Sequence, residues 1–73
     1  MRKEINSIIR SYAENHENAF EATWNLVYRE FNRQNHMYIK ARAKHRNMRP
    51  LDMVEQLGMM ADLWLVTINF LVA

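Results

Sequence analysis

Residues 34–58 read QNHMYIKARAKHRNMRPLDMVEQLG and divide the chain into two helical parts. The stretch contains the only proline, Pro50, and the only glycine, Gly58, of the 73 residues. A long amphipathic pattern precedes it and a strongly apolar segment follows it. Because proline and glycine mark helix boundaries, this stretch decides where the helices of the chain begin and end.

The last part of the stretch predicts a short capped helix. Pro50 suits a first helical turn, where its missing N–H costs nothing, and Asp52 beside it favours the positive end of the helix. Gly58 is suited to the left-handed residue that ends a helix. The apolar face of this helix consists of Leu51, Val54 and Leu57, with Met53 alongside. We expect that face to belong to the core.

Residues 40–46, KARAKHR, admit two interpretations. Their helix propensity is good, with alanine at Ala41 and Ala43. The segment is short, however, and the residue before Pro50 must leave the helical region. A short helix and a hairpin-like loop therefore both remain open.

The sequence before this stretch has helical periodicity. Apolar and aromatic residues recur every three or four positions at Ile5, Ile9, Tyr12, His16, Phe20, Trp24, Val27 and Phe31. We expect one long helix from about Arg2 to about Arg33, in which His16 is a hydrogen-bonded core or interface residue. The run ENHEN at residues 14–18 leaves an alternative, because asparagine is a poor interior helix residue. In that alternative a second helix begins at an Asn15 or Asn18 cap.

The sequence after Gly58 predicts a last helix from Met59 to Ala73 that is apolar on nearly every side. Such a helix is central in a core or buried in an interface, and in so small a chain we expect both. The residues expected in a homodimer interface are Trp64, Leu65, Ile68, Phe70 and Leu71. The run LWLVTINFLVA is too short for a bilayer, which needs about 20 apolar residues.

Composition predicts one folded domain over residues 1–73. The chain is 49% hydrophobic and 25% charged, which is typical of globular proteins. A chain this short buries only about 60% of its unfolded surface, so its core is marginal. It has no cysteine, which excludes disulfides and thiolate zinc sites and leaves self-association or a partner as support. The charged N-terminus lacks the apolar core of a signal peptide, so we expect a cytoplasmic protein.

The charges are uneven, although the net charge is only +2. Five cations and no acid fall between residues 40 and 49, and His45 lies among them. The candidate binding residues are Lys40, Arg42, Lys44, His45, Arg46 and Arg49. A protein partner is the first expectation for this basic segment. Nucleic acid is the alternative, because clustered cations bind phosphates by counterion release.

No catalytic constellation can be recognised in the sequence. Nucleophilic catalysis needs a hydroxyl or thiol beside a base, and the offset from Ser11 to His16 does not place them on one helical face. His16, His36 and His45 are too far apart in sequence to predict a metal site. The single glycine excludes a glycine-rich phosphate loop. We therefore expect no enzyme activity, no cofactor and no metal.

The predicted fold class is all-α: a small helical bundle in which the long N-terminal helix packs on a C-terminal helical hairpin. The hairpin consists of residues 50–57 and 59–72. The methionines near Gly58, which are Met53, Met59 and Met60, are expected to fill the core. An adaptable binding surface is the alternative for them.

The order of these features also resembles a known family. An aromatic helix, TWNLVYREFNRQ, precedes the apolar step HMYI, the basic segment, RPLDMVEQLG and a final apolar helix, over residues 18–70. The matching residues are Trp24, Leu26, Tyr28, Phe31, Arg42, Lys44, Arg46, Pro50, Leu51, Asp52, Val54, Glu55, Leu57 and Gly58. This order resembles a helical region of phage and prophage antirepressor-type regulatory proteins, where it often follows an N-terminal DNA-binding domain. The resemblance implies a phage-type module of transcription regulation that self-associates or binds another regulatory protein. Since these residues do not include such a DNA-binding domain, we expect no autonomous sequence-specific DNA recognition from them.

Overall fold

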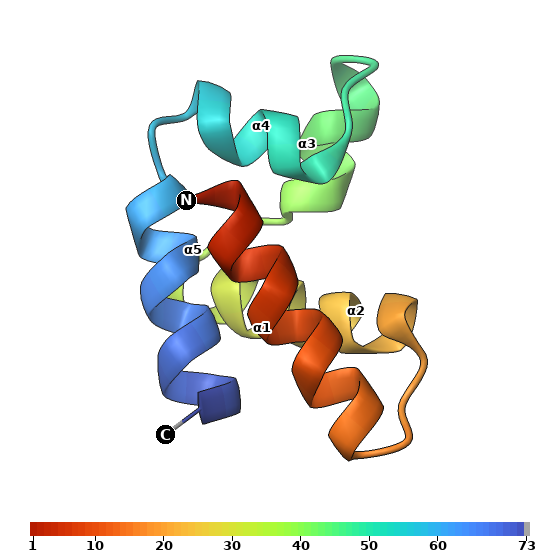
Figure 1. Cartoon of the computed structure of the whole chain (residues 1–73). Helices are drawn as coiled ribbons and strands as arrows, with labels where there is room; N and C mark the ends of the chain where they lie inside the picture. The colour runs from red at the N-terminus through yellow and green to blue at the C-terminus, as the bar shows by residue number, and fades with distance from the viewer. Residues whose placement is uncertain (73) are drawn as a thin grey trace.

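The computed structural model describes residues 1–72, and these form five helices and no strand (Figure 1). The helices are α1 (Arg2–Asn15), α2 (Phe20–Asn35), α3 (Ile39–His45), α4 (Pro50–Gln56) and α5 (Met60–Thr67). A π-helical turn over Ile68–Val72 continues α5. The all-α prediction is confirmed. Ala73, with which the predicted last helix ends, lies outside the described residues.

The prediction of one continuous helix from Arg2 to Arg33 is wrong, because the chain breaks at residues 16–19. Glu17 adopts a left-handed conformation with φ 55°, which ends α1. The predicted alternative of a break in the ENHEN run is correct, but neither Asn15 nor Asn18 caps the second helix. The N-cap of α2 is Ala19, whose carbonyl accepts a hydrogen bond of 3.1 Å from the buried hydroxyl of Thr23.

The first four helices all end in the same way. In each, a residue with positive φ follows the last turn, and the N–H of the next residue donates to the carbonyl five positions back. This is the Schellman arrangement, which satisfies carbonyls at the helix end. The residues with positive φ are Glu17, His36, Asn47 and Gly58. The prediction for Gly58 is therefore confirmed, and three other residues adopt the same conformation without being glycine.

The segment left open between helix and loop forms α3. Its first N–H, of Ile39, donates to the side-chain oxygen of Asn32 at 2.9 Å, so a residue of α2 caps α3. Its side chains Ile39 and Ala43 are buried. Because so short a helix is marginal in isolation, this cap and this burial are what hold it.

The core lies between α1, α2 and α5, and the α3–α4 pair covers one end of these three helices (Figure 1). All five helices contribute buried apolar side chains, which include Ile5, Ile9, Val27, Phe31, Ile39, Val54, Leu63 and Val66.

The main contacts of α4 are with α3, whereas α5 packs on α1 and α2. In α4, Met53 and Val54 are buried and Leu51 is half-buried, as is Leu57 just after its end. The arrangement therefore differs from a long helix packed on an α4–α5 hairpin.

An ionic cluster joins the start of α1 to α4. The guanidinium of Arg2 donates to the carboxylate of Asp52, and its Nε lies 3.7 Å from Oε2 of Glu55. These partly exposed contacts link α1 to α4, while the buried side chains of Met53 and Val54 attach α4 to the core.

His16 lies at the exposed C-terminal end of α1, so the prediction that it belongs to the core is wrong, while its alternative place in an interface stays a prediction. Its ring stacks on that of Tyr12 with centroids 3.9 Å apart, and its Nδ1 lies 3.0 Å from the Tyr12 carbonyl oxygen. The helix break explains the error, since the predicted stripe does not continue beyond α1.

None of the helices in the described part of the chain is both long and apolar enough to cross a membrane.

Candidate binding surfaces

The six predicted binding residues are all exposed, but they do not form one surface. Arg42, His45 and Arg46 line a hollow between α3 and α4. Lys40 and Arg49 line a separate trough between α2 and α4, and Lys44 lines neither. Successive residues of a helix are rotated by about 100°, so a run of cations along α3 is spread over several faces.

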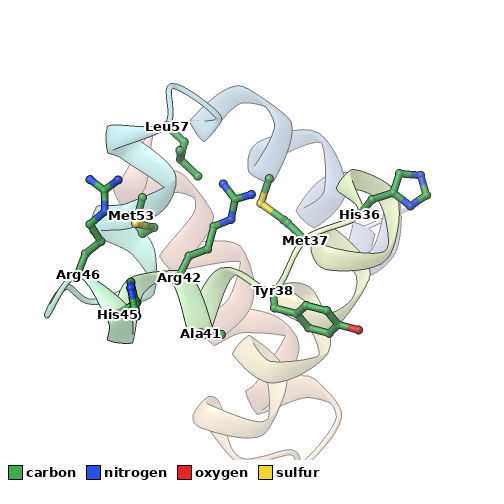
Figure 2. A pocket seen from close by; sticks show the side chains of 9 residues that line it. All are labelled: His36, Met37, Tyr38, Ala41, Arg42, His45, Arg46, Met53 and Leu57. Carbon is green, nitrogen blue, oxygen red and sulfur yellow. The ribbon is translucent and has the colours of Figure 1, made fainter.

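The first surface, which we call the basic hollow, measures about 550 Å³. Its apolar residues come from both sides: Met37 from the loop before α3, and Met53 and Leu57 from α4 and its end. Figure 2 shows the side chain of Arg42 extending between Met37 on one side and Leu57 and Met53 on the other, with Arg46 beside Met53. The hollow thus combines an apolar lining with guanidinium groups.

The basic hollow continues toward α2. A neighbouring hollow of about 660 Å³ shares His36, Met37 and Tyr38 with it and adds Arg29 and Arg33. The charge pattern of the sequence does not single out these two arginines, because the charges of residues 1–33 sum to zero. Their signal is positional: they lie four apart near the end of the helix that leads into the basic segment.

No carboxylate lines either of these two hollows. Arg33 is paired with Glu30, whose Oε2 accepts from Nε at 3.0 Å, and hydrogen bonds from Arg33 and then Gln34 lower the pKa of Glu30 to about 2. Within the described residues, Arg29, Arg42 and Arg46 make no ion pair. Their charge is therefore available to an anionic partner.

The second surface, which we call the aromatic trough, measures about 420 Å³. Phe20, Trp24 and Tyr28 of α2 line it, because residues four apart share a helical face. Pro50 and Leu51 of α4 also line it. Periodicity assigns Phe20 and Trp24 to a core stripe, whereas the structure leaves Phe20 39% exposed and Trp24 half-buried.

The predicted homodimer residues are divided between the core and the surface. Leu65 is 55% exposed and Phe70 45% exposed. Trp64, Ile68 and Leu71 are half-buried, and Trp64 and Leu71 pack against the core. The buried side of α5 is formed by Leu63, Val66 and Thr67, so α5 is not enclosed on every side.

Over residues 1–72, no three His, Asp or Glu side chains gather as ligands for a metal ion. No protein-family model, curated protein or solved structure matches this chain. The function is therefore inferred from the two surfaces.

Proposed function

We propose that the protein is a non-enzymatic binding module that holds an acidic, amphipathic segment of a partner protein in the basic hollow. The observation that carries this proposal is the combination of the half-buried Met37 and Leu57, above the buried Met53, with Arg42 and Arg46 in one hollow that no carboxylate lines. An amphipathic helix with carboxylates beside its apolar face is complementary to this surface in charge and in the apolar character of its lining.

The two kinds of group have different roles in this proposal. Burying the apolar face of the partner supplies the main favourable free energy, and methionines adapt to irregular shapes. The arginines speed the encounter and discriminate against basic segments, since complementary charges mainly set specificity and association rate. Arg29, from the adjoining hollow, extends the positive surface toward α2.

The resemblance to phage and prophage antirepressor-type proteins supports a regulatory protein as the partner. That class of partner, and a role in transcription regulation, belong to the proposal and rest on the resemblance alone.

The experiment compares two series of synthetic amphipathic helical peptides by fluorescence anisotropy. The peptides share one apolar face, and their flanking residues are glutamate in one series and lysine in the other. We expect the acidic series to bind and the double substitution Arg42→Gln with Arg46→Gln to weaken binding about fivefold to tenfold, because an exposed ion pair contributes up to about 1 kcal/mol.

The matched control is Lys3→Gln with Lys44→Gln, which removes the same charge from exposed residues that line neither the basic hollow nor the aromatic trough. It should leave the affinity for acidic peptides nearly unchanged at physiological salt. Equal binding of the two peptide series, or an equal loss in the control, would refute the proposal.

The proposal includes self-association of the module through the exposed part of α5 and the turn after it. Leu65 and Phe70 support it, since both are largely exposed apolar side chains on one C-terminal segment. Sedimentation at micromolar concentration tests this part: we expect a dimer that Phe70→Ser disrupts, and a wild-type protein that remains monomeric would contradict it.

A further inference from the structure

The aromatic trough contains rings whose faces are held in place by their neighbours. Trp24 stacks on Tyr28 with centroids 5.2 Å apart and an interplanar angle of 29°. Phe20 meets Trp24 edge to face at 6.4 Å and 89°. Tyr28 is almost fully buried and stacks on one face of Trp24. Phe20 and Trp24 are partly exposed, so a ligand can contact them.

Cations surround these rings. The ammonium of Lys40 donates to the side chain of Asn25 and lies 5.9 Å from the centroid of Tyr28. Since an ammonium has three donors, Lys40 can still donate to another acceptor. Arg49 makes no ion pair within the described residues, and the guanidinium of Arg10 lies over one face of the Phe20 ring, 5.4 Å from its centroid. Glu21 is the one acid lining the trough, so cations predominate around it.

We propose that the aromatic trough binds single-stranded nucleic acid, with a base stacked on the ring of Phe20 beside Trp24 and the phosphates held by Lys40 and Arg49. Stacking platforms flanked by cations are the usual means of holding unpaired bases. A duplex does not fit this chemistry, because its base faces are already stacked. A proline-rich peptide is the competing ligand for an aromatic trough, but such a peptide gains nothing from the flanking cations.

This inference changes the assignment of the basic segment. Lys40 and Arg49 serve the trough, whereas Arg42 and Arg46 serve the basic hollow, and the two surfaces share no lining residue. Substitutions at one surface are therefore controls for the other. An experiment that refutes one of the two proposals does not refute the other.

The experiment titrates labelled oligo(dT) and oligo(rU) of about 12 nucleotides, within the usual site sizes for single strands, with the intact chain at two salt concentrations. We expect both Phe20→Ser and the double substitution Lys40→Gln with Arg49→Gln to weaken binding about tenfold. Two phosphate contacts predict a slope of about −1.4 in log affinity against log salt. In the Trp64→Phe background, quenching of Trp24 emission should accompany binding.

Arg42→Gln with Arg46→Gln is the matched control, and it should leave oligonucleotide binding nearly unchanged at the higher salt. Binding of either oligonucleotide, weakened by the trough substitutions and not by the control, supports the proposal. The ratio of the affinities for oligo(dT) and oligo(rU) shows whether the trough prefers DNA or RNA. No binding at low salt, equal affinity for a duplex, or an equal loss in the control would overturn it. Tighter binding of a proline-rich peptide that displaces the oligonucleotide would also overturn it.

Discussion

The residues that end the first four helices differ in how well they suit the left-handed conformation they share. Gly58 adopts φ 70° without strain, and a Cβ placed there would meet no atom within 4 Å. Asn47 tolerates this region, since asparagine visits it more often than most residues do. Glu17, at φ 55°, has neither advantage.

Glu17→Gly should therefore stabilise the protein by about 0.5–1 kcal/mol, and Gly58→Ala should destabilise it by a similar amount. Urea unfolding measures both changes. Ser11→Gly, at an exposed position inside α1, is the control and should be destabilising by about 0.5–1 kcal/mol. Destabilisation by Glu17→Gly would contradict the left-handed assignment at residue 17.

Tyr28 makes stability depend on alkaline pH. Burial, the main cause, raises the pKa of its phenol from 10.0 to about 12, with a smaller increase from Asp52 and an opposing decrease from Arg2. The phenol thus ionises in the unfolded chain before it does so in the folded one. Its stabilising contribution is complete below pH 10 and is lost as the pH rises to about 12.

Tyr28→Phe keeps the ring and removes the ionisable group, so we expect its stability to fall less than that of the wild type between pH 10 and pH 12. Urea midpoints at pH 8, 10 and 11 measure the difference. The lysines titrate in both proteins, so their effect cancels. Parallel curves for the two proteins would show that Tyr28 ionises equally in both states.

At the scale of the helices, sequence identified the short helix from Pro50 best. Proline in the first turn and glycine after the last turn act locally, so their effect is readable without the fold. The break after α1 was only an alternative, because its left-handed residue is Glu17, which carries no such signal. The predicted cap of the second helix was placed at Asn15 or Asn18, whereas the N-cap of α2 is Ala19. No cap was predicted for α3, because its cap is the side chain of Asn32, seven positions before Ile39.

Three of the helix ends share a sequence pattern that hydrophobic periodicity does not detect. Met37, Met48 and Met59 each follow a left-handed residue, and each is half-buried against the core. An apolar residue at this position commonly packs on the last turn of the helix it follows. The recurring pairs His36-Met37, Asn47-Met48 and Gly58-Met59 were therefore a readable signal for three helix ends.

The cap of α3 yields a test at the same scale. Asn32→Ala removes the acceptor of the Ile39 N–H and should destabilise the protein by about 1 kcal/mol, as loss of a helix cap does. Asn15→Ala is the control, because sequence named Asn15 as a cap whereas the structure places it in the last turn of α1. Thermal unfolding compares the two. A larger loss from Asn15→Ala would favour a second helix that begins at Asn15.

At the scale of the whole molecule, sequence located the exposed cations of the basic segment but not the residues that lie beside them in the fold. The basic segment is continuous in the chain, and folding turns it toward two surfaces. Its apolar companions, Met37 and Leu57, lie on either side of it in sequence and meet only because α3 and α4 pack together. Only the tertiary arrangement reveals an amphipathic hollow.

The central claim is that the basic hollow, and not another surface, receives an acidic amphipathic segment. The most direct measurement is a ¹⁵N–¹H spectral titration of the intact chain with the glutamate-flanked peptide. We expect the largest shifts at the amides of Met37, Arg42, Met53 and Leu57, with little change at Phe20 and Trp24. Shifts centred on α5 or on the aromatic trough, with the hollow unaffected, would contradict the claim.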